Sequence, residues 1–421
     1  MSSNTQILKK TFTADLRPAY YDNFQCLADK CKVDCCTGWN INFNRKDYLK
    51  IRQQKGSETL NQAIKDALRR IKSTNSEMYA AFHLKEDGCP LLTEDKLCRL
   101  QAECGYYALP NVCKVFPRSK SYSPSGYYEY SLSPACEAVL ELLWNLPEGI
   151  DFVSDPLPKK EMSAKQLPIE NTMLISHFQE IRSLCIGLLQ DRRFPLRERI
   201  LLMGMFLQKL TAEDADVPAW LQQTEAMLQL PELAEVTTPL FASITEEQQN
   251  LILMQHIRVL LKIKDTESHK NLHAFQQMIL QHLLAKIEAT EKGSAVTLYT
   301  QKFLETKTYF TKAFAEQEYF FENLAVAVFF HKILPDCSST EDLWKSYVNF
   351  CNVYSLFRFM AICSYLEPAE DAEAAKTALF CGILCISRKL LHSAKRQVTF
   401  TNEFFETENN SLSHMAMLLS L

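Results

Sequence analysis

Clustered cysteines constrain this chain more than any other sequence feature. Of its 15 cysteines, nine lie in the N-terminal third, and these are Cys26, Cys31, Cys35, Cys36, Cys89, Cys98, Cys104, Cys113 and Cys136. In a reducing compartment, clustered cysteines are more often metal ligands or catalysts than disulfides. The remaining six are scattered through apolar, periodic sequence, where we expect small buried hydrophobes. The N-terminal region is therefore predicted to bind a metal.

The glycines exclude several nucleotide-binding folds. The chain has only 10 glycines, and no two lie within three residues of each other, so neither GxGxxG nor GxxxxGK[ST] occurs. Rossmann turns and P-loops need closely spaced glycines for the backbone to approach a phosphate. The 46 Lys and Arg residues against 50 Asp and Glu residues give a net charge of −4, which argues against a nucleic-acid partner held by overall positive charge.

The chain is expected to be cytoplasmic, without a membrane partner. Its first residues lack the apolar run of a signal peptide. The most apolar stretches, 324–330 and 379–386, are shorter than the ~18 residues that a membrane span requires.

The predicted fold is mainly α, with a cysteine-rich N-terminal metal-binding module packed on a larger all-helical C-terminal domain. Leu60, Ile64, Leu68 and Ile71 recur at the period of an amphipathic helix. Residues 120–132 alternate about a Pro-Ser-Gly turn, which predicts a short β-hairpin. Prolines within 146–170 favour a linker. We predict a metal-binding module at 1–145, this linker, and a helical domain at 171–421.

Two signals stand out in the helical part. Residues 245–248, Thr-Glu-Glu-Gln, resemble a capping box that opens a helix. Residues 303–365 are rich in Phe and Tyr, which are expected to form the core, with the wall of a ligand pocket as the alternative.

Four cysteine motifs carry the sharpest signal. In order, they are FxCxxxxCxxxCCxGW at residues 24–39, CPLL with LCRLQ at 89–101, CKVFPR at 113–118 and SPACE at 133–137. No CxxC occurs, so the pattern lacks the paired knuckles of zinc ribbons and fingers, and a cluster with irregular ligand spacing suits it better. Spacing alone does not select the ligands.

These motifs resemble the cysteine-cluster family whose full-length members are flagellin lysine N-methylases. The resemblance covers roughly residues 18–140, and a looser likeness at 321–335 favours the full-length branch. It implies metal ligation by Cys26, Cys31, Cys35, Cys36, Cys89, Cys98, Cys113 and Cys136. Cys104 is the least favoured ligand. A structural or donor-positioning [4Fe–4S] cluster is favoured over a radical-generating one, because Cys31, Cys35 and Cys36 do not match the CxxxCxxC loop of radical enzymes. Zinc is the alternative metal.

The resemblance also implies methyl transfer from S-adenosylmethionine to surface lysines of flagellin. Tyr127, Tyr128, Glu129 and Tyr130 are candidates to line and orient a lysine channel, with an ordinary packed hairpin as the alternative. Arg118 is a candidate for the donor's carboxylate, or forms a surface salt bridge. Trp39 is a weaker donor-binding candidate and more simply shields the metal.

Two non-enzymatic readings remain beside this one. The chain could be a metal carrier or redox sensor, or a flagellar partner that holds flagellin without modifying it. A simple chelating module would need only the first ~140 residues, and the remaining length predicts a second binding task.

Overall fold

The computed structural model describes residues 15–36, 41–73, 75–83, 88–156, 164, 173–212, 215–230, 233–262, 294–365, 371–391, 405 and 409–421. Within these ranges the chain is mainly helical, and all strands precede residue 155. The predicted mainly-α fold with an N-terminal hairpin is confirmed. Trp39 lies outside the described residues.

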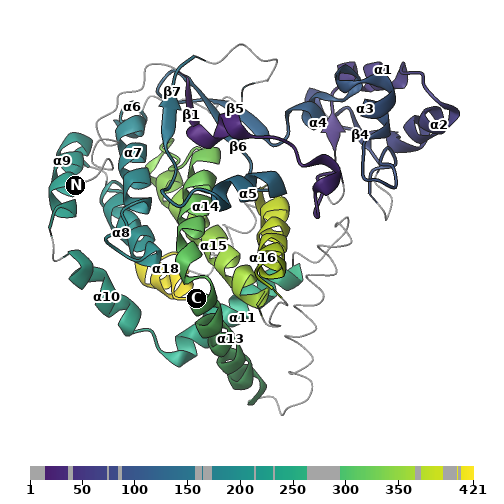
Figure 1. Ribbon diagram of the computed structural model, residues 1–421. Coiled ribbons are helices and arrows are strands. Elements are labelled where there is room, and N and C mark those ends of the chain that lie inside the picture. Colours follow the sequence, from purple (N-terminus) through teal and green to yellow (C-terminus); the bar gives the residue numbers. More distant parts are fainter. Residues whose placement is uncertain are drawn as a thin grey trace.

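A helical body makes up most of the molecule, with α14 (Glu318–His331) and α15 (Thr340–Cys363) at its centre (Figure 1). The other helices of the body are α5 (Glu137–Trp144), α6 (Met173–Ser176), α7 (Phe178–Leu189), α8 (Leu196–Lys209), α9 (Val217–Leu228), α10 (Ala234–Ala242), α11 (Glu246–Lys262), α13 (Ser294–Ala313), α16 (Ala372–Ile386), the π-helical turn η8 (Ser387–Leu391) and α18 (Leu412–Leu419). Phe320, Phe321 and Phe359 are fully buried, so the prediction that aromatic residues of 303–365 form the core is confirmed for them. Tyr309 is exposed.

Buried polar side chains join the central helix to its neighbours. Glu322 of α14 accepts hydrogen bonds from Arg192 (3.0 Å) and from Arg199 of α8 (2.6 Å). Asn323 donates to the carbonyls of Leu143 (3.0 Å) and Leu146 (2.8 Å), which fixes α14 against the end of α5. The sequence around 321–324 therefore serves packing between helices.

The predicted capping box opens α11. The backbone N–H of Gln248 donates to Thr245 Oγ1 (3.3 Å), and the Gln248 side chain accepts from the N–H of Thr245 (2.9 Å). This reciprocal pairing satisfies two backbone donors at the start of the helix.

A four-stranded sheet covers one end of the body, in the order β5 (Arg118–Tyr122), β6 (Tyr128–Leu132), β1 (Leu16–Pro18) and β7 (Phe152–Ser154) (Figure 1). β5 and β6 form the predicted hairpin, with Gly126 in the turn at φ 89°, a conformation that glycine adopts without strain. β1 pairs parallel to β6 and antiparallel to β7. Because β7 spans residues 152–154, a strand lies inside the linker predicted at 146–170.

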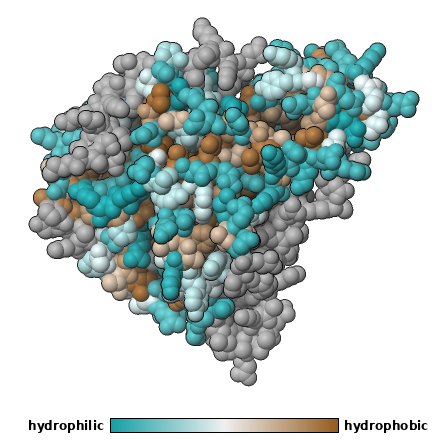
Figure 2. Space-filling model, viewed as in Figure 1, coloured by the Kyte–Doolittle hydropathy of each residue, from teal (hydrophilic) through white to brown (hydrophobic). Residues whose placement is uncertain are grey.

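Residues 41–113 form a small lobe with its own hydrophobic core, built around Ile51, Leu60 and Leu100. Its elements are β2 (Asn42–Phe43), α1 (Arg45–Arg52), α2 (Glu58–Ala67), β3 (Leu68–Arg70), β4 (Ala80–Phe82), α3 (Arg99–Cys104) and α4 (Asn111–Val115), with the strands in the order β2-β4-β3. The lobe lies beside the body (Figure 1), and its visible surface is mostly hydrophilic (Figure 2). Segments 16–33 and 127–150 instead contribute to the body's core, and the predicted domain boundaries stay a prediction.

One predicted helix is wrong beyond Ala67. The period of Leu60, Ile64, Leu68 and Ile71 predicts a continuous helix, but α2 ends at Ala67 and residues 68–70 form β3. Leu68 pairs with Phe82 of β4, and the N–H of His83 donates to the Ala67 carbonyl (2.6 Å). Pairing with a distant strand overrides the local helical period.

Among the described residues, no helix combines the length and apolar character needed to cross a membrane.

Candidate metal centre and adjoining pocket

The first four motif cysteines lie in an irregular segment between the sheet and the small lobe. The backbone N–H of Ala28 donates to the sulfur of Cys26 (3.4 Å). Phe24 anchors the segment in the body's core, and the Arg118 guanidinium lies 4.6 Å from the centre of its ring. Arg118 also donates to the Phe24 carbonyl (3.4 Å), so this candidate donor-binding residue contacts the cysteine segment.

Two charged side chains hold this segment next to Cys136. The Glu137 carboxylate accepts hydrogen bonds from the backbone N–H groups of Lys32 (3.3 Å) and Val33 (2.7 Å). Arg388 donates to the carbonyls of Val33 (2.7 Å), Asp34 (2.8 Å) and Ala135 (3.2 Å). The segments of Cys31, Cys35 and Cys136 are therefore fixed side by side at the edge of the body.

Four of the motif cysteines, Cys36, Cys89, Cys98 and Cys113, lie at the core of the small lobe. The N–H of Cys89 donates to the Cys36 carbonyl (3.1 Å), and a β-bridge joins Leu92 to Cys98. Cys89 belongs to the lobe's core, and Cys36, Cys98 and Cys113 pack against it.

Helix α4 holds Cys113 in place through contacts with α1. The N–H of Asn111 donates to Asp47 (2.7 Å), and Lys50 donates to the Leu109 carbonyl (2.6 Å). This fixes the start of α4 on the lobe.

Electrostatic interactions connect the cysteines of both segments. Burial raises the pKa of Cys113 well above its usual value, and the nearby thiols of Cys35, Cys89 and Cys98 raise it further. Burial likewise raises the pKa of Cys136 to about 12, with a contribution from Cys35. The pKa of Cys35 is instead lowered, because the Cys36 thiol donates a hydrogen bond to it and Arg388 adds a positive charge. Cys35 is therefore the favoured thiolate.

The cysteines are neighbours without forming a closed single-ion site. Among the described residues, no three His, Cys, Asp or Glu side chains are close enough together to hold one metal ion. Cys104 also packs against the lobe's core, but its thiol contacts the Lys55 carbonyl (3.9 Å). Burial and the Glu103 carboxylate raise its pKa.

The predicted lysine-channel residues divide between two faces of the hairpin. Tyr128 faces outward, where the Lys120 ammonium lies 3.9 Å from the centre of its ring. Tyr130 is buried against Tyr21, with ring centres 6.0 Å apart. Glu129 is buried and accepts two hydrogen bonds from Arg182 (2.5 and 2.6 Å). Only Tyr127 of the four lines a pocket described in the structure.

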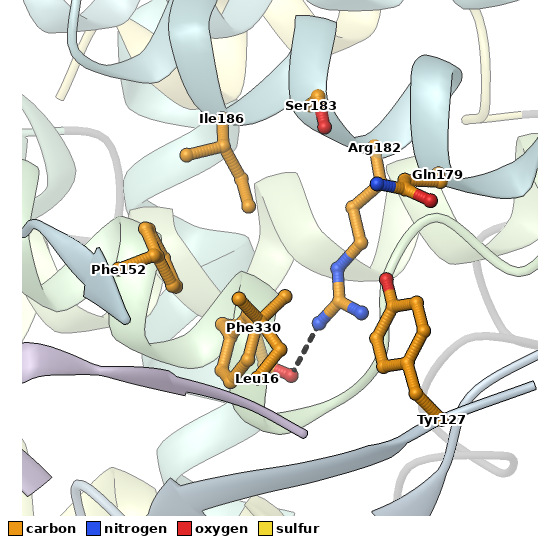
Figure 3. Close-up of a pocket in the computed structure, with 8 residues that line it drawn as sticks. All are labelled: Leu16, Tyr127, Phe152, Gln179, Arg182, Ser183, Ile186 and Phe330. Atoms are coloured by element: carbon orange, nitrogen blue, oxygen red, sulfur yellow. Dashed lines mark hydrogen bonds between the residues drawn. The ribbon is translucent and has the colours of Figure 1, made fainter. Parts of the chain in front are cut away.

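This small pocket lies between the sheet and the helices of the body (Figure 3). Its lining residues are Leu16, Tyr127, Phe152, Gln179, Arg182, Ser183, Ile186 and Phe330. Arg182 donates to the Phe330 carbonyl (2.8 Å, dashed in Figure 3), while its Nε–H is buried without a hydrogen-bond partner. Burial raises the pKa of Tyr127 to about 12, and Glu129 adds to the shift. Its phenol is therefore a proton-bearing donor at neutral pH.

Sequence reasoning missed the residues that organise the cysteine segment and the pocket. Glu137 ends the SPACE motif but was given no role, and Arg182 and Arg388 belong to no motif. Arg182 stands beside Ile181 in an apolar helical stripe, where a charged residue is unusual. Such a buried charge needs a partner, and here Glu129 supplies it.

Comparison with known proteins places the chain in a family. Residues 182–418 match the model of the FliB lysine N-methylase C-terminal domain. The chain belongs to the FliB lysine N-methylase family. The match begins at Arg182 and covers the helical body after the sheet.

Individual relatives align over a shorter part of this family member. It is 31% identical over 135 residues to a Lysine-N-methylase of Salmonella typhimurium, and 30% identical over 135 residues to that of Salmonella choleraesuis. It is also 31% identical to the Flagellar biosynthetic protein FliU of Salmonella muenchen. Each alignment covers 32% of this chain; it spans 33% of either methylase and 78% of FliU. No solved structure matches this chain.

Proposed function

We propose that this chain is a protein-lysine N-methyltransferase that transfers methyl groups from S-adenosylmethionine to surface lysines of flagellin. Membership of the FliB lysine N-methylase family is the observation that carries the proposal. The names Lysine-N-methylase and Flagellar biosynthetic protein FliU of its relatives support both the reaction class and a flagellar substrate.

The pocket between sheet and helices supports this chemistry as a lysine-accepting site. A lysine amine attacks a methyl group only when neutral, and reaching that form at pH 7 from a pKa of about 10.4 costs about 4–5 kcal/mol. Burial against Tyr127, Phe152 and Phe330 disfavours the ammonium, and the Arg182 guanidinium acts in the same direction. In the transfer, the amine nitrogen forms a bond to the methyl carbon. The carbon–sulfur bond breaks with its electron pair staying on sulfur, and the nitrogen loses a proton.

The cysteines are proposed to hold a [4Fe–4S] cluster, with zinc as the alternative. The donor set is sulfur, as such clusters require. A single zinc ion needs four ligands within bonding distance of one point, whereas the irons of a cubane each take one thiolate and hold the sulfurs farther apart. The irregular spacing of the motif cysteines along the sequence favours the cluster. A cluster here would order the cysteine segment and position the donor.

The decisive experiment mixes anaerobically purified full-length chain with flagellin and S-adenosylmethionine, and maps methylated lysines by mass spectrometry. We expect methylation that depends on both the chain and the donor. Tyr127→Ala opens the pocket wall and should lower the rate on the order of tenfold or more, or about 1.4 kcal/mol of barrier. Tyr128→Ala is the matched control on the outer face of the hairpin, and should stay near the wild-type rate.

Two results would argue against these assignments. Equal losses in both variants, or none in Tyr127→Ala, would move the lysine site elsewhere. Wild-type chain that carries metal but never methylates flagellin would overturn the enzyme assignment. It would favour the non-catalytic reading, a metal-binding redox or flagellar interaction protein.

A further inference from the structure

The outer edge of strand β3 carries backbone groups that its own sheet does not use. In the order β2-β4-β3, no strand of the described residues pairs with the far side of β3. The N–H of Ile71 donates to the Tyr79 carbonyl (3.0 Å). At the other end of the strand, the N–H of His83 donates to the Ala67 carbonyl (2.6 Å). Since bonded positions alternate along an antiparallel ladder, the N–H and C=O of Arg70 point away from β4.

Local contacts already occupy the preceding outward position, Leu68. Its N–H donates to the Ile64 carbonyl at the end of α2, and its carbonyl accepts a hydrogen bond from the Arg69 guanidinium (3.0 Å). The next outward position is Arg70. An added strand would therefore pair with the backbone at Arg70 and beyond it.

Arg70 also begins a row of stacked side chains on the surface of the lobe. Its guanidinium lies 4.5 Å from the centre of the Tyr79 ring, and that ring centre lies 5.4 Å from the ring centre of Tyr48 on α1. The Arg70 side chain is exposed, and both tyrosines are partly exposed. Arginine and tyrosine are enriched at protein interfaces. The outward backbone of Arg70 thus lies next to side chains suited to contact with a protein.

The charges around this edge favour an acidic partner. Arg69, Arg70 and Lys72 are exposed, and among the described residues no carboxylate forms an ion pair with them. Residues 41–113 carry 12 Lys and Arg residues against nine Asp and Glu residues, whereas the rest of the chain carries 34 against 41. An acidic segment is therefore attracted to the small lobe and repelled by the remainder of the chain.

We propose that an extended, acidic segment of the substrate protein docks on this edge as an added strand. Its backbone pairs with Arg70, and its carboxylates lie beside Arg69, Arg70 and Lys72. Strand addition of this kind takes its affinity from main-chain hydrogen bonds and its specificity from side-chain contacts. The assignment rests on the proposed function, which supplies flagellin as the substrate protein. The small lobe then holds flagellin while the target lysine reacts elsewhere on the chain.

The test measures binding of the full-length chain to purified monomeric flagellin by biolayer interferometry, without S-adenosylmethionine. The double variant Arg69→Glu with Arg70→Glu should weaken binding on the order of tenfold or more, since it reverses the charge that meets the acidic segment. Added salt should weaken binding of the wild type as well. Lys55→Glu with Lys96→Glu is the matched control, because it changes the lobe's charge equally at exposed positions outside β3. It should bind like the wild type.

A second pair of variants separates backbone pairing from charge. Arg70→Pro and Arg70→Gln remove the same charge, but only proline also removes the N–H that pairs with the added strand. We therefore expect weaker binding in Arg70→Pro than in Arg70→Gln. An edge strand tolerates proline where the N–H points away from its neighbour. Circular dichroism identifies a variant that fails to fold, and the charge-reversal pair then decides.

Methylation kinetics supply an independent readout. Docking at a distance from the reacting atoms contributes to binding of the substrate and leaves the chemical step unchanged. The double variant Arg69→Glu with Arg70→Glu should therefore raise the KM for flagellin about tenfold and keep kcat near the wild-type value.

Several outcomes would overturn the proposal. Unchanged flagellin affinity in Arg69→Glu with Arg70→Glu would mean that these charges only keep the edge from pairing with other copies of the chain. Equal losses in the control pair would mean that overall lobe charge accounts for binding, and a wild type that does not bind flagellin would contradict docking outright. Methylation with an unchanged KM in the β3 variants would refute the docking site and leave the proposed function standing. Binding that depends on β3 without methylation would do the reverse.

Discussion

Arg182 and Glu129 form an ion pair whose side chains are only 5% and 2% exposed. Removing one member of a buried pair leaves the other charge uncompensated, at a cost of about 3–5 kcal/mol. We therefore expect Arg182→Met to lower the free energy of unfolding by about this amount in urea denaturation. The double variant Arg182→Met with Glu129→Gln should recover much of the loss. A single variant as stable as wild type would mean that Glu129 gains solvent access.

At this scale the sequence indicates candidate reactive residues more readily than the residues that hold them in place. The cysteine motifs, Tyr127 and Glu129 could be selected from residue type and spacing. Arg388 could not, because its role is to bond the carbonyls of Val33, Asp34 and Ala135, and no local pattern reveals which distant backbone a guanidinium will reach.

Among the elements, three helices meet at His256. Its ring contacts the Ile252 carbonyl within α11 (2.8 Å) and the Ser355 hydroxyl of α15 (2.9 Å), and that hydroxyl donates to the Leu418 carbonyl of α18 (2.7 Å). Burial lowers the pKa of His256 from 6.5 to about 4, and the pKa of the nearby His414 likewise to about 4. The folded protein therefore holds the rings of His256 and His414 in their neutral form.

This contact predicts a loss of stability in mild acid. Since the folded pKa is lowered, the unfolded chain binds protons more readily between pH 6.5 and 4, so stability is full above pH 6.5 and falls as the pH drops. For His256 the loss is about 3 kcal/mol. Denaturant titrations at several pH values should give a shallower slope for His256→Gln. His177→Gln, outside this contact, should keep the wild-type slope, and equal slopes in all three proteins would contradict the assignment.

The contact between α8 and α15 depends on Gly204. A Cβ atom there would come within 2.1 Å of the ring of the fully buried Tyr347. Overpacking of this kind costs about 1–3 kcal/mol, so Gly204→Ala should lower the thermal midpoint. Tyr347→Leu makes room, and the double variant should lose less than the sum of the two single losses. Additive losses would place the strain elsewhere.

The sequence predicted element boundaries correctly where the interacting residues lie close together in the chain. The capping box of α11 and the hairpin turn at Gly126 were predicted, because each involves residues within a few positions of one another. The end of α2 at Ala67 and the strand β7 were not, because their partners, β4 and β1, are far away in the chain.

At the level of the whole molecule, the two cores predict two units of stability. Leu60 is fully buried in the small lobe, and Leu60→Ala should cost about 2–5 kcal/mol there. Hydrogen exchange should then rise across 41–113 and stay unchanged in α14 and α15. Leu343→Ala, equally buried in α15, is the converse control. Uniform loss of protection in both variants would mean that the molecule unfolds as one unit.

The Arg388 contacts have a consequence for how the protein is made. A ribosome releases the chain from its N-terminus, so every residue of the small lobe emerges well before Arg388 does. Cys89, Cys98 and Cys113 can therefore pack on the lobe's core while the chain is still being synthesised. The segment carrying Cys31 and Cys35 acquires its guanidinium support only when synthesis is nearly finished. The order of translation thus separates folding of the small lobe from fixation of this segment. Chains truncated before residue 388 would lack the hydrogen bonds to Val33, Asp34 and Ala135.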